Sequence, residues 1–224
     1  MRASTILPPS LGIMLECAAE DEASPEGASA LEDIVENFKY AADNKLPICQ
    51  DTGMAVVFAD LGQDAHITGG LLEDAVNEGV RRGYAKGLLR MSVVGDPLRR
   101  KNTDDNTPCV LHVRLTSGNR LSIYVAPKGF GSENASAMRM FLPSDTADTI
   151  EDFIVSTVSR AGANPCPPVI LGVGLGGTIE QCALIAKRAL IRSADTHNRD
   201  NFYAKMEKRV LGKVVVFDYH PTPT

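Results

Sequence analysis

A thiol, an amide, a carboxylate and a hydroxyl lie next to one another in the segment LPICQDTG, residues Leu46–Gly53. In an extended backbone Cys49 and Asp51 project to the same side, because strand side chains alternate with a period of two. A metal bound by Cys49 would then have an ionisable carboxylate beside it. A buried cysteine followed by an aspartate that caps a turn explains the same residues equally well, and the segment alone leaves both interpretations open.

A second thiol, Cys166, lies between prolines in the segment Asn164–Pro168. Proline restricts the backbone on both sides, and a ligand that is held in place in advance loses less entropy when it binds a metal. A rigid turn with an incidental cysteine is the simpler interpretation of this segment taken alone.

The chain has five cysteines, none of them in a CxxC pair. An odd number without a secretion signal argues against a disulfide framework, and the spacing does not support a zinc ribbon. Any metal site must therefore be assembled from cysteines that are distant in sequence. Cys109 lies on an expected strand and Cys182 on the apolar face of an expected helix, so both are expected in the core. The four histidines form no metal-binding pattern, and we assign them no catalytic role.

A glycine-rich segment, Gly172–Thr178 (GVGLGGT), matches the pattern GxGxxG. It follows an expected strand and begins an expected helix, which Thr178 can cap, and free N–H groups at a helix N-terminus bind anions. A dinucleotide-binding fold is the main alternative that the pattern raises. That fold needs a second parallel strand carrying an acid such as Asp195, whereas residues 193–205 are polar and helical in tendency, so we reject it. The glycines then allow close helix–strand packing, or they contact an oxyanion or a metal cluster.

Two polar loops, Asn102–Pro108 (NTDDNTP) and Pro127–Asn134 (PKGFGSEN), flank an expected β-hairpin. Each is typical of an ordinary surface loop, but together they could converge on one ligand. Gly129 and Gly131 would let the backbone approach that ligand closely. Lys128 would supply the positive charge that a dicarboxylate needs.

The elements that must position these residues indicate a mixed α/β (α+β) fold, in which a sheet with a β-hairpin is packed by several helices. Apolar residues recur with the helical period in the helices, and they alternate with polar residues on both sides of a turn at Ser117–Asn119, so the hairpin is expected to have one buried face. Residues 1–30 contain prolines and glycine and are expected to be irregular, and residues 31–224 are expected to form one domain. The expected helices span 30–44, 71–88, 147–161, 178–193 and 201–209, and the expected strands span 54–59, 111–115, 121–125, 168–173 and 213–219.

Length, composition and charge exclude several functional classes. The 224 residues suffice for one sizeable α/β domain or at most two small ones. A formal net charge of −5 argues against a general nucleic-acid binder, which needs a basic surface. No apolar run is long enough to span a membrane, and the first residues do not have the pattern of a signal peptide. We therefore expect a cytoplasmic protein with no nucleic-acid and no membrane partner.

Five segments, in the same order along the chain, resemble the alpha subunit of class I fumarate hydratases and of the related L-tartrate dehydratases. They are LPICQDTG (46–53), LRMSVVGDPL (89–98), NTDDNTP (102–108), PKGFGSEN (127–134) and NPCPPVILGVGLGGT (164–178). The resemblance runs from about residue 31 to about residue 211. It implies a hydro-lyase that reversibly hydrates fumarate to malate or dehydrates L-tartrate.

The resemblance implies a [4Fe-4S] cluster that acts as a Lewis acid. In the family, three cysteines hold three irons, and the fourth iron stays open to bind a substrate oxygen, as metal-assisted addition requires. Cys49 and Cys166 match two of the cluster ligands. The third cluster cysteine is not present in the matching segment: in the family it lies in a C-terminal stretch, of which residues 212–224 resemble a shortened remnant.

The resemblance also assigns the substrate site. Gln50 and Asp51 match residues that line it, and Asp51 is expected to be the catalytic residue near the reacting carbon or water. Arg90 matches an arginine that binds a substrate carboxylate, a task that suits a planar guanidinium. Gly131 lies in a loop that contributes backbone contacts to the ligand. Phe130 stands where the family usually has another glycine.

In the family, the other catalytic acid or base and several carboxylate-binding residues belong to a second domain or to a beta subunit. We therefore expect a chain that is catalytically incomplete alone. It is expected to form an oligomer with a beta subunit or C-terminal catalytic domain and to bind a small dicarboxylate substrate. The alternative is a shortened homologue that serves as a non-catalytic binding or assembly module.

Overall fold

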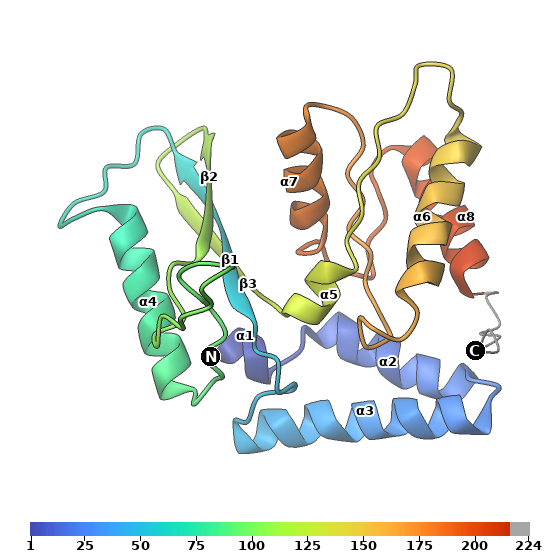
Figure 1. Cartoon of the computed structure of the whole chain (residues 1–224), viewed down its shortest axis with the longest axis horizontal. Helices are drawn as coiled ribbons and strands as arrows, with labels where there is room; N and C mark the ends of the chain where they lie inside the picture. The colour runs from blue at the N-terminus through green and yellow to red at the C-terminus, as the bar shows by residue number, and fades with distance from the viewer. Residues whose placement is uncertain (216–224) are drawn as a thin grey trace. The chain divides into compact units, whose positions relative to one another are not determined.

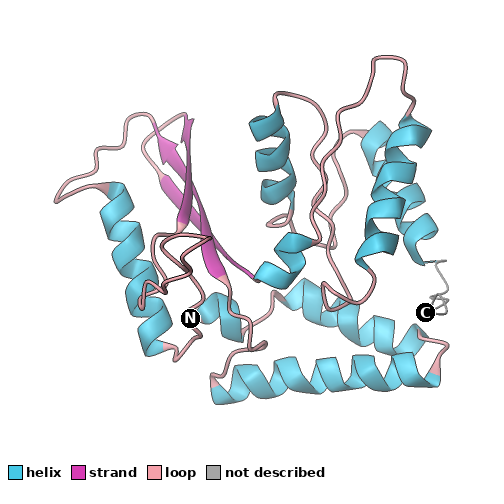
Figure 2. Ribbon diagram, in the orientation of Figure 1, coloured by secondary structure: helices cyan, strands magenta, loops and turns pink. Residues whose placement is uncertain are grey.

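A computed structural model of the chain describes residues 1–215, which divide into two units with their boundary between Phe130 and Gly131 (Figure 1). The first unit combines a three-stranded sheet with helices, and the described part of the second consists of helices and loops (Figure 2). The mixed α/β class expected from the sequence is therefore confirmed.

Strand β1 (Met54–Gly62) is the central strand of the sheet, whose order is β2-β1-β3. Strand β2 (Val110–Thr116) runs parallel to β1, and β3 (Leu121–Lys128) runs antiparallel to it. The apolar run from Ala55 to Ala59 is buried at every position. This confirms the strand expected over 54–59 and explains its continuous hydrophobic sequence, because a central strand covered on both faces does not need to alternate.

The expected hairpin is wrong, because β2 and β3 do not pair with each other: β1 lies between them. The loop after β2 crosses the end of β1, where Gly62 N donates to Arg120 O at 2.7 Å. A Cβ at Gly62 would lie 2.3 Å from Gly118 O, so this crossing requires glycine. The alternation located both strands correctly, but the buried face expected for them is wrong, since Val113, Leu115 and Val125 are all exposed.

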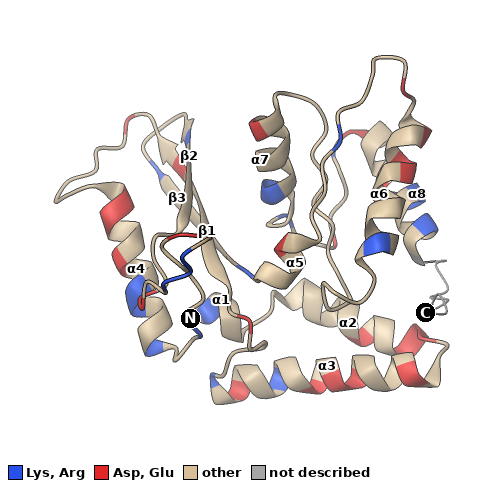
Figure 3. Ribbon diagram, in the orientation of Figure 1, with Lys and Arg blue, Asp and Glu red and all other residues tan. Residues whose placement is uncertain are grey.

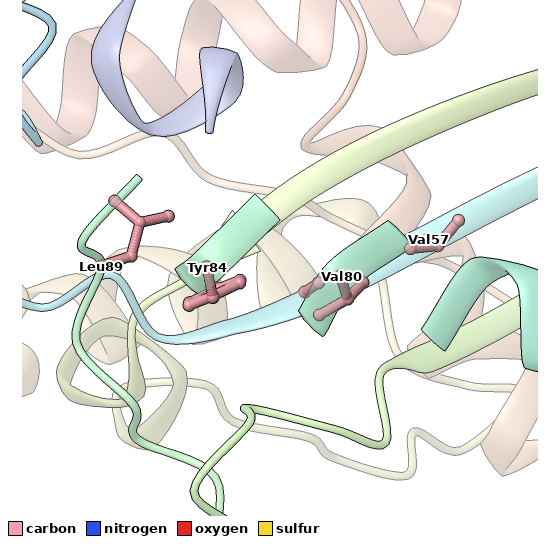
Figure 4. Close-up of a cluster of buried hydrophobic side chains, with 5 residues drawn as sticks. Val57, Val80, Tyr84 and Leu89 are labelled. Atoms are coloured by element: carbon pink, nitrogen blue, oxygen red, sulfur yellow. The ribbon is translucent and has the colours of Figure 1, made fainter. Parts of the chain in front are cut away.

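Helix α4 (Leu72–Lys86) packs on the sheet and forms the core of the first unit with it (Figure 4). Val80 and Tyr84 lie on the helix face that packs with Val57 of β1 and with Leu89, which follows the helix. The helix expected over 71–88 is thus confirmed. Its amphipathic pattern has a direct cause, because one face is buried against the strands while the other faces solvent.

Residues 1–30 are largely helical, so the expectation of an irregular segment is wrong. They form α1 (Arg2–Thr5), α2 (Pro9–Asp21) and the first turns of α3 (Pro25–Asn44). Pro9 and Pro25 are the first residues of their helices, where the missing N–H of proline leaves no hydrogen bond unmade. Ser24 caps α3 by accepting from Gly27 N at 3.2 Å. Helices α2 and α3 pack side by side, and acidic residues are frequent along both (Figure 3).

The described part of the second unit contains three longer helices, and a short helix begins at its boundary. They are α5 (Phe130–Asn134), α6 (Ala147–Ala161), α7 (Ile179–Ala189) and α8 (Asn201–Val215). Helix α6 agrees with the helix expected over 147–161. It packs against α8 through Glu151, which is fully buried and accepts from Arg209 Nε and from Lys213 Nζ, both at 2.9 Å. None of the helices in residues 1–215 is long and apolar enough to cross a membrane.

Three further expectations are corrected. Residues 168–173 form no strand in the part of the chain that the structure describes, and Val169, Ile170 and Leu171 are exposed, because an apolar run becomes a strand only where a partner strand lies beside it. The segment 127–134 is not a loop but the end of β3 followed by α5. Residues 213–215, expected to begin a strand, are the last residues of α8, and the rest of that expected strand lies outside the described residues.

Candidate active site

The segment that carries Cys49, Gln50 and Asp51 bends from the surface into the core just before β1. Cys49 and Gln50 are exposed, Asp51 is half-buried, and Thr52 and Gly53 are buried. The thiol of Cys49 lies against its neighbour, since Sγ donates to Gln50 Oε1 at 3.5 Å. The backbone therefore presents the three candidate side chains toward the surface while the end of the segment is anchored inside the unit.

Two backbone amides hold the carboxylate of Asp51. Gly53 N donates to Oδ1 at 3.0 Å, and Phe130 N donates to Oδ2 at 3.1 Å. The contact with Gly53 makes Asp51 a turn cap, and the contact with Phe130 brings a second candidate segment against it. A Cβ at Gly129 would lie 2.9 Å from Oδ2, so glycine at that position leaves the space that the carboxylate occupies. The close approach that Gly129 allows is thus an approach to Asp51.

The backbones of the same two segments also touch at Gly53. This residue has a φ of 57°, in the left-handed region that favours glycine. A Cβ there would lie 2.0 Å from Lys128 O. Both the conformation and the contact therefore require glycine between Thr52 and the start of β1.

Arg90 lies in the same unit, on the segment that follows α4. Leu89 before it is only 4% exposed and belongs to the core, whereas Arg90 itself is exposed. The hydroxyl of Thr52 donates to the backbone carbonyl of Arg90 at 3.0 Å. The structure therefore brings the segments of Asp51 and Arg90 into direct contact and leaves the guanidinium at the surface.

Tyr84 and Asn106, which the sequence does not single out, support this arrangement from the core. The hydroxyl of Tyr84 donates to Thr52 O at 2.8 Å, and Asn106 Nδ2 donates to Gly53 O at 3.0 Å. Burial raises the pKa of Tyr84 to about 12, so the hydroxyl remains a donor at neutral pH. In the sequence Tyr84 is one more residue of a helix face. Asn106 is one of several polar residues in NTDDNTP, and the resemblance of that segment to a known family was its only signal.

In the second unit the thiol of Cys166 is exposed on a tight turn. Its backbone has a φ of 58°, and its N–H donates to Ala163 O at 3.0 Å. Pro165 and Pro167 restrict the chain on either side. The rigid turn expected from these prolines is therefore present, and it exposes the thiol.

Gly131 lies in α5 and approaches the same turn. A Cβ on Gly131 would lie 3.8 Å from Asn164 O, which is an ordinary contact, so this packing does not require glycine. Glu133 of α5 forms an ion pair with Lys187 of α7. The second unit thus brings together the segments of Gly131 and Cys166 and the helix that follows the glycine-rich segment.

The glycine-rich segment lies directly on α7. Cβ atoms at Gly172 and Gly174 would lie 2.3 Å from Ala186 O and 2.2 Å from Cys182 O, which supports the close-packing interpretation of these glycines. Thr178 occupies the N-cap position of α7, but its hydroxyl donates to a glutamate of the first turn and makes no cap. Among the described residues, no strand lies between α6 and this segment and none follows α7, which agrees with the rejection of a dinucleotide-binding fold.

Two thiols of the chain have the accessibility that a metal ligand needs. Cys49 and Cys166 are exposed, although cysteine is among the most buried residue types, and a thiol that binds a metal must be reachable. They lie in different units. Among the described residues, no group of three or more His, Cys, Asp or Glu side chains is placed to hold a metal ion.

Two of the three remaining thiols are less accessible to a metal. Cys109 is half-buried against the core of the first unit, and burial raises its pKa, which disfavours the thiolate that binds metals. Cys182 is also half-buried, and its Sγ donates to Gly174 O at 3.1 Å. Both thiols were expected in the core, and the structure confirms this only in part, because each is half-buried rather than fully buried. Cys17 is exposed on α2.

Comparison with known proteins identifies the family. The family model described as "Fumarate hydratase (Fumerase)" matches residues 1–219. A protein of Methanocaldococcus jannaschii named "Putative L(+)-tartrate dehydratase subunit alpha" is 35% identical over 218 residues, which cover 95% of this chain and 76% of that protein. A protein of Escherichia coli named "L(+)-tartrate dehydratase subunit alpha" is 26% identical over 210 residues, which cover 92% of this chain and 69% of that protein. The chain therefore belongs to the fumarate hydratase (Fumerase) family.

Proposed function

We propose that this chain is the iron–sulfur-binding subunit of a hydro-lyase that hydrates fumarate or dehydrates L-tartrate. The observation that carries the proposal is the arrangement around Asp51. Two amides hold its carboxylate on a segment that exposes the thiol of Cys49 and contacts the segment of Arg90. Membership of the family supports hydro-lyase chemistry, and relatives named as tartrate dehydratase subunits support a small dicarboxylate as the substrate.

Asp51 is the residue proposed to transfer a proton when water is added or removed. Its two amide contacts fix both carboxylate oxygens, so that the group meets the substrate in one orientation, as general acid–base catalysis needs. Arg90 is proposed to bind a substrate carboxylate through its planar guanidinium. Gln50 and the backbone N–H of Gly131 are the proposed hydrogen-bond donors to the remaining substrate oxygens.

Cys49 and Cys166 are the thiolates proposed to hold the cofactor. A [4Fe-4S] cluster, when bound, would supply a Lewis acid that polarises a substrate oxygen. The contribution of the chain is to keep both thiols exposed, that of Cys166 on a tight turn between two prolines.

A beta-type subunit is the proposed partner. The relatives are named alpha subunits, which supports assembly with a second subunit. A partner would supply the basic side chains for the second substrate carboxylate and the other acid or base of the reaction.

The test is anaerobic co-purification with a beta-type partner, followed by iron and sulfide counting and by assays on fumarate, malate and L-tartrate. Turnover of at least one of these acids is expected, together with bound iron and sulfide. A stable complex that turns over none of the three would contradict the proposal and would favour the assembly-module alternative. The Cys182→Ser variant is the matched control for the loss of a cysteine, because that thiol is half-buried within its own unit.

A further inference from the structure

Asn106 is fully buried, and both ends of its side-chain amide bind backbone groups. Oδ1 accepts from Ser92 N at 2.7 Å and from Val93 N at 3.0 Å, and Nδ2 donates to Gly53 O at 3.0 Å. One side chain thus joins the two segments that carry the proposed substrate-binding and catalytic residues. A carboxylate would lack the donor, and an aliphatic side chain would leave three backbone groups without this partner.

The loop that carries Asn106 is itself fixed to the same segment. Asn102 Nδ2 donates to Met91 O at 2.9 Å, and Thr103 N donates to Val93 O at 3.0 Å. Asn106 has a φ of 58°, a conformation that asparagine tolerates better than most residues. The polar loop expected to converge on a ligand therefore acts, at this position, as an internal scaffold.

Tyr84 makes the second connection. Its hydroxyl donates to Thr52 O at 2.8 Å and lies 3.2 Å from Gly53 O. The side chain is only 5% exposed and is held on α4 within the core cluster (Figure 4). A rigid helix thus fixes the two carbonyl groups that follow Asp51.

The anchored peptides contact the carboxylate of Asp51 and the backbone of Arg90. Gly53 donates its N–H to the carboxylate of Asp51, and Thr52 donates its hydroxyl to the carbonyl of Arg90. A displacement of these peptides would therefore move Asp51 and loosen the contact with the segment of Arg90.

We infer that Asn106 and Tyr84 are positioning residues: by holding the carbonyls of Thr52 and Gly53, they set the position of Asp51 relative to the segment of Arg90. The inference rests on the proposed function of that site. Both residues are buried and act through the backbone.

Two variants test the connection with minimal change. Tyr84→Phe keeps the ring in the core and removes the hydroxyl, and Asn106→Asp keeps the acceptor and removes the amide donor. Val80→Ala is the matched control, because Val80 belongs to the same helix and the same cluster but has no hydrogen-bonding group. For each protein, kcat and KM are measured in the complex with the beta-type partner, well below the melting temperature. Deuterium uptake by peptides covering 50–54 and 90–94 is measured on the same full chains.

The expected result is a fall in kcat of about 10- to 100-fold for Tyr84→Phe and Asn106→Asp, because a misplacement of about 1 Å can cost about 10²-fold. KM should change less, and deuterium uptake should rise in both peptides. Val80→Ala should lower the melting temperature and keep its kcat. A merely structural role predicts the opposite, namely that kcat follows melting temperature across all three variants.

Failure of the inference can be told apart from failure of the proposed function. A wild-type complex without turnover would refute the function, and deuterium uptake alone would then decide whether the two side chains anchor the segments. Wild-type uptake over 50–54 in folded Tyr84→Phe and Asn106→Asp would overturn the inference. A wild-type kcat for both Tyr84→Phe and Asn106→Asp, measured in an active complex, would also overturn the inference.

Discussion

An alanine at position 129 would displace the carboxylate of Asp51. A Cβ built on Gly129 lies 2.9 Å from Asp51 Oδ2, whereas ordinary contacts of a Cβ begin at 3.4 Å, so the oxygen must move by about 0.5 Å. The backbone of Gly129 is outside the left-handed region, and alanine therefore adds no backbone strain there. The substitution acts on the carboxylate and leaves the rest of the segment in place.

The cost follows from the hydrogen bond that this movement breaks. Phe130 N lies 3.1 Å from Oδ2, already near the long end of the usual N–H···O range, and a further shift of about 0.5 Å takes it beyond that range. A hydrogen bond to a charged group contributes about 1.5–3 kcal/mol. Because Asp51 is only half-buried and water can replace the amide, we expect the free energy of unfolding to fall by about 1 kcal/mol. Turnover should fall at least about tenfold, since the catalytic group is misplaced.

Urea unfolding of the chain and steady-state kinetics of its complex measure the two effects. Gly79→Ala is the matched control, because no atom lies within 4 Å of a Cβ at that position of α4. It should stabilise the helix by roughly 1 kcal/mol and leave kcat unchanged. Wild-type stability together with wild-type turnover in Gly129→Ala would refute the argument that this glycine makes room for the carboxylate.

Cys49→Ser and Cys166→Ser are each expected to abolish the visible absorbance of a reconstituted cluster, while Cys182→Ser keeps it; a complete cluster in Cys49→Ser would contradict the ligand assignment. Asp51→Asn should keep the cluster and lose about 10²–10⁴-fold in turnover, the usual contribution of a positioned acid or base, and unchanged turnover would reduce Asp51 to a turn cap. The hydrogen-bonded arginine of α8 lowers the pKa of buried Glu151. The stability that this carboxylate contributes is therefore fully present above its ordinary pKa of 4.5 and is lost as the pH falls through the lower value of the folded state. Chemical unfolding as a function of pH should show a smaller acid loss in Glu151→Gln than in the wild type, and equal losses would exclude this role.

The spacing of apolar residues along the sequence was sufficient to locate most of the longer helices. The helical period located α4 to within two residues at either end and matched the bounds of α6, because each helix buries one face. Pro9 and Pro25 instead led to the wrong expectation of an irregular N-terminal segment. Proline in a sequence indicates an interruption, yet each of these two residues begins a helix. Proline is compatible with the first turn of a helix, and the sequence around it does not show whether a helix follows.

Strand pairing depended on the tertiary structure. Alternating residues identified β2 and β3 and the turn between them, but alternation does not say which strand lies beside which. The insertion of β1 between them depends on residues far away in the chain, for example the pairing of Val57 with Leu111 and with Val125. The same holds for residues 168–173, whose apolar sequence is typical of a strand that the described structure does not form.

For the site, the sequence by itself determined which chemistry is available: two thiols, a carboxylate and a guanidinium within segments that resemble one family. Only the tertiary structure decided what holds them. Tyr84 reaches the carbonyl of Thr52 across 32 positions of the chain, and Asn106 reaches that of Gly53 across 53 positions. Such hydrogen bonds depend on the packing of α4 and the sheet rather than on local propensity. For this reason one asparagine of a polar loop becomes a fully buried anchor while its neighbours stay nearer the surface.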